Sequence, residues 1–593
     1  MGIVGALDPR ARIAALAPRW EALSHVRADA RHPLDTARQI SFALGFDPAA
    51  AVGAARLVAG GRIRPLVPWA LARFARDMVR RGRAGPQALI HLHACNSPEQ
   101  PAIVAGSTRL TYGELDARIN RLAHGLAALG LVPGDRVGVM LHNGVEHVEL
   151  GAASGWLGIS LVMIGYRLKP KEVAYLLRDS GARALVFHGE YARTVEEALA
   201  EGGGPPRTRC LLAGAGHAAD FPAYEDLYRG GDSDAPPSLE GGGYGGLMIY
   251  TSGTTGRPKG ASRSLRDTGM GPVLNFLADL PMKYDERHLV VSPMYHSAGA
   301  FFSSVTFGLG ATLIVHERFE PEAVLDAIER ERVTSLMLVP TMFQRLVALG
   351  ADAIRKRDLS SLRWMISAAA PLPTELAREI EDLFGPILYN FYAATETGVV
   401  TLARPGEHTA RPGTIGRLVR GTEVRLLDEN GDDVPVGGVG ELYARNAMMV
   451  SGYHGNDEAT RAAQKGGFFS VGDLARCDAD GYYYLADRKH DMVISGGINI
   501  YPWEIEQRLH QHPAVLDVAV VGVPDAEWGE SLAAFVVVRP GMSTTVEELQ
   551  RFVTAELADY KRPRVVLFVD ELPRNLTGKL LKRELRARLA PRD

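Results

Sequence analysis

Residues 245–261 read GGLMIYTSGTTGRPKGA, an apolar run followed by a loop of glycines and hydroxyl side chains that leads to Lys259. The apolar run predicts a strand, and the loop begins where this strand ends. Glycines let the backbone turn several N–H groups toward one point, and hydroxyls with one ammonium add donors and charge. We therefore expect the loop to hold phosphate. Its residues are Thr251, Ser252, Gly253, Thr254, Thr255, Gly256, Lys259 and Gly260.

This loop is not the P-loop of nucleotide hydrolases. That motif reads G-x-x-x-x-G-K-[ST]. Here Gly253 is followed five positions later by Pro258, and Lys259 is followed by Gly260. A turn without a ligand is the alternative that the segment alone leaves open.

Length and composition describe an ordinary globular protein. The 593 residues predict three or four folding units. The 66 Lys plus Arg against 69 Asp plus Glu leave a net charge of −3, which gives no general attraction to nucleic acid. Cys95, Cys210 and Cys477 lie far apart and fit neither a disulfide framework nor a zinc-binding pattern. Without an apolar run of membrane-spanning length or a signal peptide, we expect a cytoplasmic protein.

The chain divides into three regions by pattern. Residues 1–95 predict a helical N-terminal extension. Residues 96–488 alternate short apolar runs with helical stretches, which predicts parallel sheets covered by helices, and hairpins follow around Asn430-Gly431. Residues 491–593 form a small α+β unit. The predicted fold class is α/β.

One segment of the extension is strongly basic. Residues 51–90 hold eight arginines and one acid, Asp77. On a helix, one face would be apolar and the opposite face would carry Arg73, Arg76 and Arg80, so residues 64–83 could lie on the anionic inner face of a membrane. A helix docked on its own protein is the alternative. The apolar face consists of Val67, Leu71, Phe74 and Met78.

The run YTSGTTGRPKG (250–260) resembles the signature of the adenylate-forming superfamily, in its acyl-CoA synthetase branch. Further segments resemble the family's motifs in the same order over about residues 100–590. They are SAAAPL (367–372), YNFYAATETG (389–398), SVGDLA (470–475), DRKHD (487–491), SGGINIYPWEIE (495–506) and LPRNLTGKLLKREL (572–585).

The resemblance implies a role for each matching residue. The loop residues, Thr254 among them, would hold the phosphates of ATP, and Glu396 would bind Mg²⁺. Tyr392 would stack on adenine beside Ala369, with Thr395 at the α-phosphate and with Asp473 and Arg488 on the ribose. Gly496 and Gly497 would approach the thiol, and Lys579 would bridge the acyl carboxylate and the α-phosphate.

The implied reaction has two steps. A carboxylate attacks the α-phosphorus of ATP and expels pyrophosphate, and the thiol of coenzyme A then attacks the acyl-adenylate and expels AMP. Because Lys579 occupies space that the thiol needs, the family rotates its mobile C-terminal unit about a hinge. The hinge would lie near residues 489–490, where His490 replaces the usual Asp or Lys. Ala393 in place of the usual Gly, and ASRSLRD at 261–267, also depart from the pattern.

Of all the features of the implied reaction, the identity of the acid is the one that the sequence predicts least well. In PMYHSAGAFF (293–302), His296 resembles the gate to the acyl pocket, and a core histidine is the alternative. The small residues after it and the sparse charge nearby favour a medium- or long-chain fatty acid. An aryl or sterol-type acid would also fit.

Two other functions remain open at this stage. One is an acyl-AMP ligase that loads a carrier protein, although only fourteen residues follow Lys579, too few for an attached carrier. The other is a silent adenylate-binding scaffold, which the presence of Lys259, Glu396, Asp473, Arg488 and Lys579 disfavours.

Overall fold

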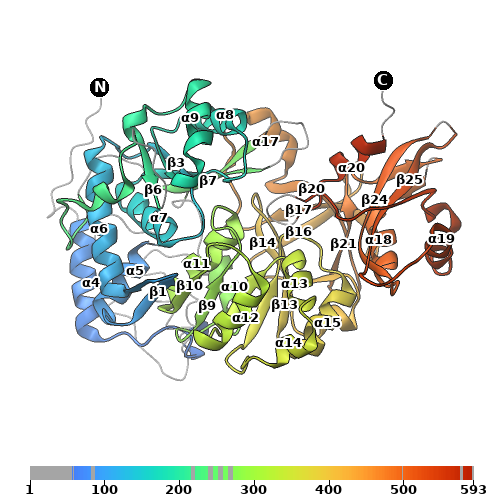
Figure 1. Ribbon diagram of the computed structural model, residues 1–593, viewed down its shortest axis with the longest axis horizontal. Helices are drawn as coiled ribbons and strands as arrows, with labels where there is room; N and C mark the ends of the chain where they lie inside the picture. The colour runs from blue at the N-terminus through green and yellow to red at the C-terminus, as the bar shows by residue number, and fades with distance from the viewer. Residues whose placement is uncertain are drawn as a thin grey trace.

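The computed structural model describes residues 56–57, 59–81, 87–214, 221–237, 245–251, 258–264, 271–496, 498–525, 527–574 and 579–589. Over these residues the chain is an α/β protein built on three sheets, and the predicted fold class is confirmed (Figure 1). The helices that the sequence predicts for the N-terminal extension can be compared with the structure only from residue 56 onward. There the structure has α4 (Pro68–Arg81) and α5 (Gln87–Asn96).

The first sheet carries the strand that leads into the glycine-rich loop. Its order is β18-β8-β7-β4-β3-β5-β6, with β7 to β6 in parallel and with β8 and β18 antiparallel. Alternate side chains of its strands pack on α6 and α7 on one face and on α8 and α9 on the other. The bounds are β3 Arg136–Met140, β4 Ser160–Met163, β5 Ala184–His188, β6 Cys210–Ala213, β7 Gly246–Thr251, β8 Lys259–Ser264, β18 Gly452–Tyr453, α6 Tyr112–Ala128, α7 Val145–Leu157, α8 Pro170–Ser180 and α9 Ala192–Ala200.

The second sheet begins as a parallel sheet with helices on both faces. Strands β10, β11 and β12 are buried along their whole length, as apolar runs in a covered parallel sheet should be. Helices α12, α13 and α15 cover one face, and α10 and α11 cover the other. The bounds are β1 Pro101–Ala105, β2 Thr108–Thr111, β9 Arg287–Val290, β10 Thr312–Val315, β11 Ser335–Leu338, β12 Trp364–Ser367, β13 Leu388–Ala394, α10 Gly271–Asp279, α11 Ser297–Leu309, α12 Pro321–Arg330, α13 Pro340–Val347, α14 Ala351–Arg355 and α15 Thr374–Phe384.

Antiparallel strands extend this second sheet toward the C-terminal unit. The order continues β13-β14-β15-β21-β20-β17-β16, so the predicted hairpins are hydrogen-bonded to the large sheet through β15. The bounds are β14 Gly398–Ala403, α16 Glu407–Ala410, β15 Thr414–Leu418, β16 Glu423–Leu427, β17 Val439–Arg445, α17 Asp457–Ala463, β19 Gln464–Lys465, β20 Phe468–Cys477 and β21 Tyr483–Arg488.

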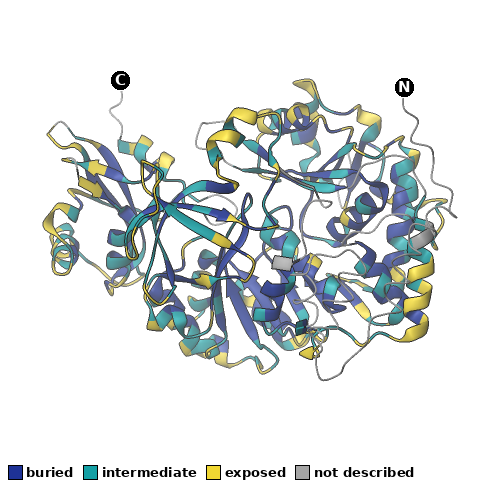
Figure 2. Ribbon diagram, turned by 180° about the vertical axis from the view of Figure 1, so that it is seen from behind, coloured by how far each residue is buried: buried dark blue, intermediate teal, exposed yellow. Residues whose placement is uncertain are grey.

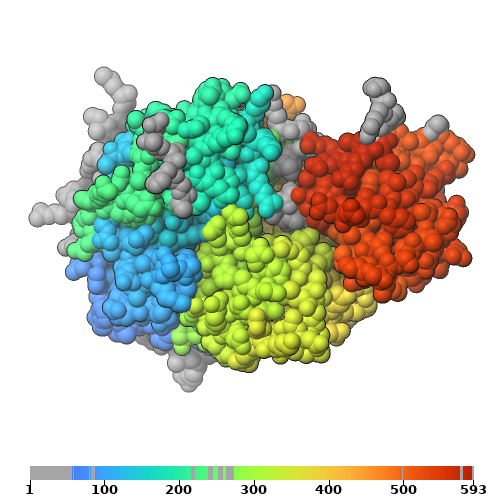
Figure 3. All heavy atoms as spheres, in the orientation of Figure 1, coloured from blue at the N-terminus to red at the C-terminus, as the bar shows by residue number. Residues whose placement is uncertain are grey.

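The chain after β21 forms a separate lobe with its own sheet and apolar cores. Figure 3 shows this lobe in red and orange beside the larger body. The bounds are β22 Val493–Ser495, β23 Ile498–Ile500, α18 Pro502–His510, β24 Val515–Asp525, β25 Gly529–Val538, α19 Val546–Thr554, β26 Val565–Phe568 and α20 Lys582–Leu589.

The basic helix α4 is docked on the protein, with part of its apolar surface left outside. Phe74 and Met78 pack against the core that α5, α6 and α7 share. Trp69 and Leu71 are 60% and 43% exposed. The yellow residues of this helix in Figure 2 contrast with the dark blue interior behind it. No described helix is long and apolar enough to cross a bilayer.

Candidate active site

A cavity of about 1340 Å³ brings most of the predicted site residues together. Residues from the first sheet, the second sheet and the C-terminal lobe all line it. Those among the predicted set are Thr251, Lys259, His296, Ala369, Tyr392, Thr395, Glu396, Asp473, Arg488 and Lys579.

Most of the remaining predicted residues lie outside the part of the chain that the structure describes. They are Ser252, Gly253, Thr254, Thr255, Gly256 and Gly497. Gly496 does not line the cavity: its N–H donates to the carbonyl of Trp528 at 2.8 Å. Its φ of +55° and the 2.8 Å between a built Cβ and the Trp528 ring explain why glycine stands there.

The carboxylate of Glu396 lies at the edge of the first sheet. Its Oε1 accepts hydrogen bonds from the Thr251 hydroxyl at 3.0 Å and from the Tyr453 hydroxyl at 3.2 Å. The Nζ of Lys259 lies 5.2 Å from the centre of the Tyr453 ring. The sequence reasoning missed Tyr453, because only the pairing of β18 with β8, which sets Tyr453 opposite Ala261, brings it to the loop.

Asp473 connects the predicted ribose and adenine contacts. Its Oδ2 accepts a hydrogen bond from the Tyr392 hydroxyl at 2.6 Å, and its Oδ1 lies 3.2 Å from Nε of Arg488. Asp473 and Arg488 are register partners on β20 and β21, so sheet pairing places them opposite each other. Burial and the Asp473 charge raise the pKa of Tyr392, which keeps its hydroxyl a donor.

Lys579 is half-buried where residues of both lobes line the cavity. Burial and the positive charge of Arg488 lower its pKa to about 8, against the opposing pull of Asp473, Asp491 and Glu396. The ammonium therefore lies within the electrostatic influence of carboxylates from both lobes, Asp473 and Glu396 among them.

The segment after β21 is held by charges of both lobes. The Nζ of Lys489 lies 3.0 Å from Glu441, and Arg586 of α20 lies 2.7 Å from Asp491. His490 lies between them, with its Nε2 3.6 Å from Asp491. Burial, together with the neighbouring cations Arg488, Lys579 and Arg586, lowers the pKa of His490, so the imidazole is neutral near pH 7 in this conformation.

Ala369 has an unusual backbone conformation beside the cavity. Its φ is +69°, in the left-handed region that costs an L-residue about 1–2 kcal/mol. It is the second residue after β12, at the carboxyl edge of the second sheet, and it lines the cavity. Strained residues of this kind concentrate at ligand sites.

The opposite end of the cavity is apolar and ends on aromatic rings. Phe301 and Phe391 line it, and each lies 5.7 Å from the fully buried ring of Phe276. His296 precedes α11 and also lines the cavity, and burial lowers its pKa to about 4. Arg345 does not line the cavity, and one of its guanidinium nitrogens lies 3.6 Å from a carboxylate oxygen of Glu320.

Comparison with known proteins agrees with this geometry. Residues 91–454 match the family model described as "AMP-binding enzyme", and residues 504–579 match "AMP-binding enzyme C-terminal domain". The chain belongs to the AMP-binding, adenylate-forming enzyme family. It is an AMP-forming acid–CoA ligase.

Three relatives illustrate the range of this family. The chain is 40% identical to a feruloyl-CoA synthase of Amycolatopsis sp, with 83% of this chain and 96% of the relative covered. It is 35% identical to a long-chain-fatty-acid–CoA ligase of Mycobacterium tuberculosis, with 84% and 97% covered. An anthranilate CoA ligase in complex with anthranoyl-AMP superimposes with a TM-score of 0.77 at 28% identity, with 85% and 97% covered.

Proposed function

We propose that this ligase activates a compact aryl carboxylic acid and transfers the acyl group to coenzyme A. The observation that carries the proposal is the aromatic end of the cavity. Phe301 and Phe391 line it and Phe276 and Phe302 stand behind them, with centroid separations of 5.4–6.4 Å. Aromatic rings attract one another at 4.5–7 Å, so a planar acid fits this wall, whereas an extended chain would have to displace buried rings.

The uncharged lining of this part of the cavity supports a substrate with a single carboxylate. Among the described residues, none that α11, β11 or α13 contributes to the cavity carries a charge. A second acid group would therefore be buried without a partner, at a cost of several kcal/mol. The 40% identity with the feruloyl-CoA synthase is consistent with an aryl acid.

A fatty acid is the second candidate. The 35% identity with the long-chain-fatty-acid–CoA ligase supports it, as do the exposed apolar residues of α4. For that candidate we propose peripheral contact of residues 64–83 with the anionic inner face of a membrane, by an otherwise cytoplasmic enzyme.

The site residues would act as follows in the first step. Lys259 and the glycine-rich loop would hold the outer phosphates, and Asp473 with Arg488 would hold the ribose. Lys579 would neutralise the carboxylate as it approaches the α-phosphate, and Thr395 would contact that phosphate. His296, neutral at pH 7, would separate the nucleotide from the acyl pocket without adding charge.

Magnesium fits the residues present. The Glu396 carboxylate and the Thr251 hydroxyl, 3.0 Å apart, are both hard oxygen ligands at the wall of the cavity. Glu396 would hold the ion, which would supply positive charge to the substrate phosphates.

The second step would need a different arrangement of the lobes. Lys579 occupies the cavity, while Gly496 lies outside it against Trp528. We propose that the lobe after residue 490 rotates about residues 489–490, removing Lys579 and bringing the Gly496-Gly497 loop to the thiol.

Pyrophosphate exchange with a panel of acids tests the substrate class. The panel contains benzoic, cinnamic and hydroxycinnamic acids and saturated fatty acids of eight, twelve and sixteen carbons. We expect the best aryl acid to exceed the best fatty acid at least tenfold in kcat/KM. Phe301→Ala should raise the relative rate with the longer fatty acids, because it shortens the aromatic wall, whereas Phe568→Ala, exposed on the other lobe, should change nothing.

The outcomes separate the alternatives. A preference for sixteen carbons in the unaltered enzyme, unchanged in the Phe301→Ala variant, would reject the aryl proposal in favour of the fatty acid. Thioester formation with a carrier protein but not with coenzyme A would reject the acceptor. Exchange with none of the acids would reject both the aryl and the fatty-acid candidates.

A further inference from the structure

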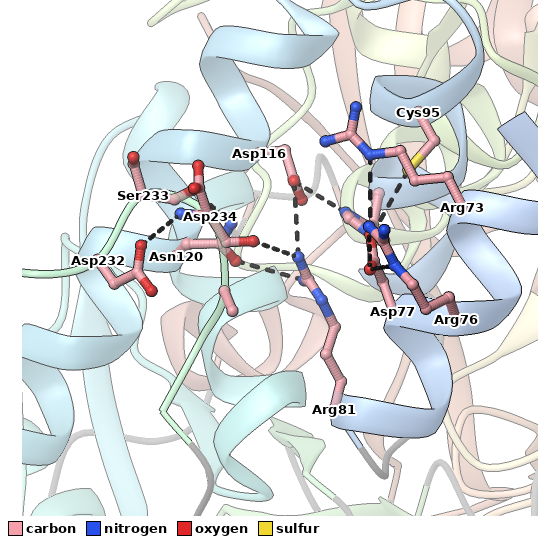
Figure 4. Close-up of polar contacts among 12 residues, drawn as sticks. Arg73, Arg76, Asp77, Arg81, Cys95, Asp116, Asn120, Asp232, Ser233 and Asp234 are labelled. Atoms are coloured by element: carbon pink, nitrogen blue, oxygen red, sulfur yellow. Dashed lines mark hydrogen bonds and ion pairs between the residues drawn. The ribbon is translucent and has the colours of Figure 1, made fainter.

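A buried cluster of a thiol, an imidazole and two carboxylates lies far from the active site, where the N-terminal extension meets the body. His91 and Cys95 are four residues apart on α5, which places both on one face of that helix. Asp77 of α4 faces them, and Asp116 of α6 completes the group. Figure 4 shows Asp77, Cys95 and Asp116 around Arg81 at the junction of these helices.

We propose that Asp77, His91 and Cys95 form a zinc site that fastens helix α4 to helix α5. The three side chains each offer one ligand atom, and these atoms all lie within 4.8 Å of one another. A thiolate, an imidazole and a carboxylate are the ligand types that zinc takes in proteins.

The two separations from His91 Nε2 are those of a tetrahedral site. With Zn–S near 2.3 Å and Zn–N and Zn–O near 2.0–2.2 Å, neighbouring ligand atoms around zinc are roughly 3.3–3.6 Å apart. Cys95 Sγ lies 3.6 Å from His91 Nε2, and Asp77 Oδ2 lies 3.4 Å from the same nitrogen. Nε2 therefore faces both of the other ligands at the separation that a shared ion requires.

The other nitrogen of His91 is fixed as in known zinc sites. Its Nδ1 lies 2.9 Å from Asp116 Oδ2 and donates to it when Nε2 is a ligand. Histidines that bind metals commonly donate their second N–H to a carboxylate, which orients the ring and sets the tautomer. Asp116 would be this positioning residue.

The charges match a divalent cation. With the thiol deprotonated and His91 neutral, Asp77, Cys95 and Asp116 contribute three negative charges. The buried guanidinium of Arg81, 3.9 Å from Asp116, offsets one of them. Arg76 binds the other oxygen of Asp77, Oδ1, at 2.9 Å, and Arg73 lies 3.8 Å from Oδ2; both guanidiniums are more than half exposed and would turn toward solvent when an ion binds. Asp77 is 15% exposed, so water can reach the fourth position.

A second group of possible ligands serves as a control. His142, His188 and Glu190 also converge, after β3 and at the end of β5. There the Arg318 guanidinium lies 2.8 Å from Glu190 and 3.4 Å from His142 Nε2. The Tyr191 hydroxyl also lies 2.9 Å from His142 Nε2, so the ligand nitrogen itself is already occupied and we expect no zinc there.

The test uses the full chain, purified without chelators and without a metal-affinity column. After incubation with equimolar zinc and gel filtration, elemental analysis should find about one zinc per chain. Cys95→Ser and Asp77→Asn should lower the retained zinc at least tenfold. Cys210→Ser, a second buried thiol, and His188→Gln should retain it. Asp116→Asn should weaken zinc affinity about 10- to 100-fold.

Cobalt provides a readout that does not depend on a variant being folded. Titration of the unaltered metal-free chain with Co²⁺ should produce a near-ultraviolet thiolate-to-cobalt band, absent in Cys95→Ser. Pyrophosphate exchange, which does not involve the cluster, confirms that each variant is folded. Failure to retain zinc together with no cobalt–thiolate band would overturn the proposal and leave a hydrogen-bonded charge cluster. Zinc retained by Cys95→Ser but lost in His188→Gln would also overturn it.

Discussion

At the scale of single residues, the charge of Lys579 sets a limit on the pH range of the first step. Burial and Arg488 lower its pKa to about 8, so the ammonium is present below that pH and is lost as the pH rises through it. We expect kcat/KM for pyrophosphate exchange to fall above about pH 8, by about tenfold per pH unit.

Two variants check that this alkaline limb belongs to Lys579. Lys579→Arg should lower the rate at pH 7 but flatten the limb, since the guanidinium stays charged. Lys356→Arg, on the surface, should leave the profile unchanged. An alkaline limb near pH 10, or one that Lys579→Arg does not alter, would contradict the assignment.

The site residues also show which positions in the cavity short motifs can predict and which they cannot. Asp473, Arg488 and Glu396 could be predicted because each lies within a dense run of distinctive residues. Tyr453 could not, because its position depends on a two-residue strand pairing with a distant segment. The same limit applies to the proposed zinc ligands: Asp77, His91 and Cys95 fit no spacing rule, since the packing of two helices brings them together.

At the scale of elements, the exposed part of α4 makes a membrane test possible. Trp69 and Leu71 are exposed next to Arg73 and Arg76, an arrangement that suits an anionic interface. For the fatty-acid candidate, we expect the enzyme to sediment with vesicles containing acidic lipids, and we expect binding to weaken with salt.

The variant for this test is Trp69→Ala. Burial of a large apolar side chain contributes about 1.5–3 kcal/mol, so vesicle affinity should fall about tenfold or more. Val436→Ala, exposed at 73% on another element, is the control. Equal binding of both variants, or the absence of binding at low salt, would mean that α4 serves only to pack against the body.

Elements were predicted best where the pattern is local. The alternation of short apolar runs with helical stretches correctly predicted parallel sheets covered by helices, because strands buried on both faces, such as β10 and β11, consist almost wholly of apolar residues. The pattern did not predict that the hairpins join the large sheet through β15. Edge pairing depends on backbone hydrogen bonds between distant segments, which side-chain periodicity does not record.

At the scale of the whole molecule, the two half-reactions should respond differently to one substitution. Lys579→Ala should reduce adenylation by about 10²- to 10³-fold, the usual effect of losing one charge-stabilising donor. Thioester formation from supplied acyl-adenylate should continue at nearly its normal rate, since Lys579 would have left the site by then. The measurements are pyrophosphate exchange and AMP release from synthetic acyl-adenylate. Equal losses in both would reject the rotation.

The continuity of the second sheet constrains how such a motion could take place. Strands β20 and β21 are bonded into a ladder that reaches back to β1 and β2, and Arg488 is the last residue of β21. Bending that ladder would break many backbone hydrogen bonds at once, so the displacement has to be absorbed by the torsion angles of the few residues that follow. The turnover rate would then respond steeply to a stiffer backbone at those positions and only weakly to changes in the strands themselves.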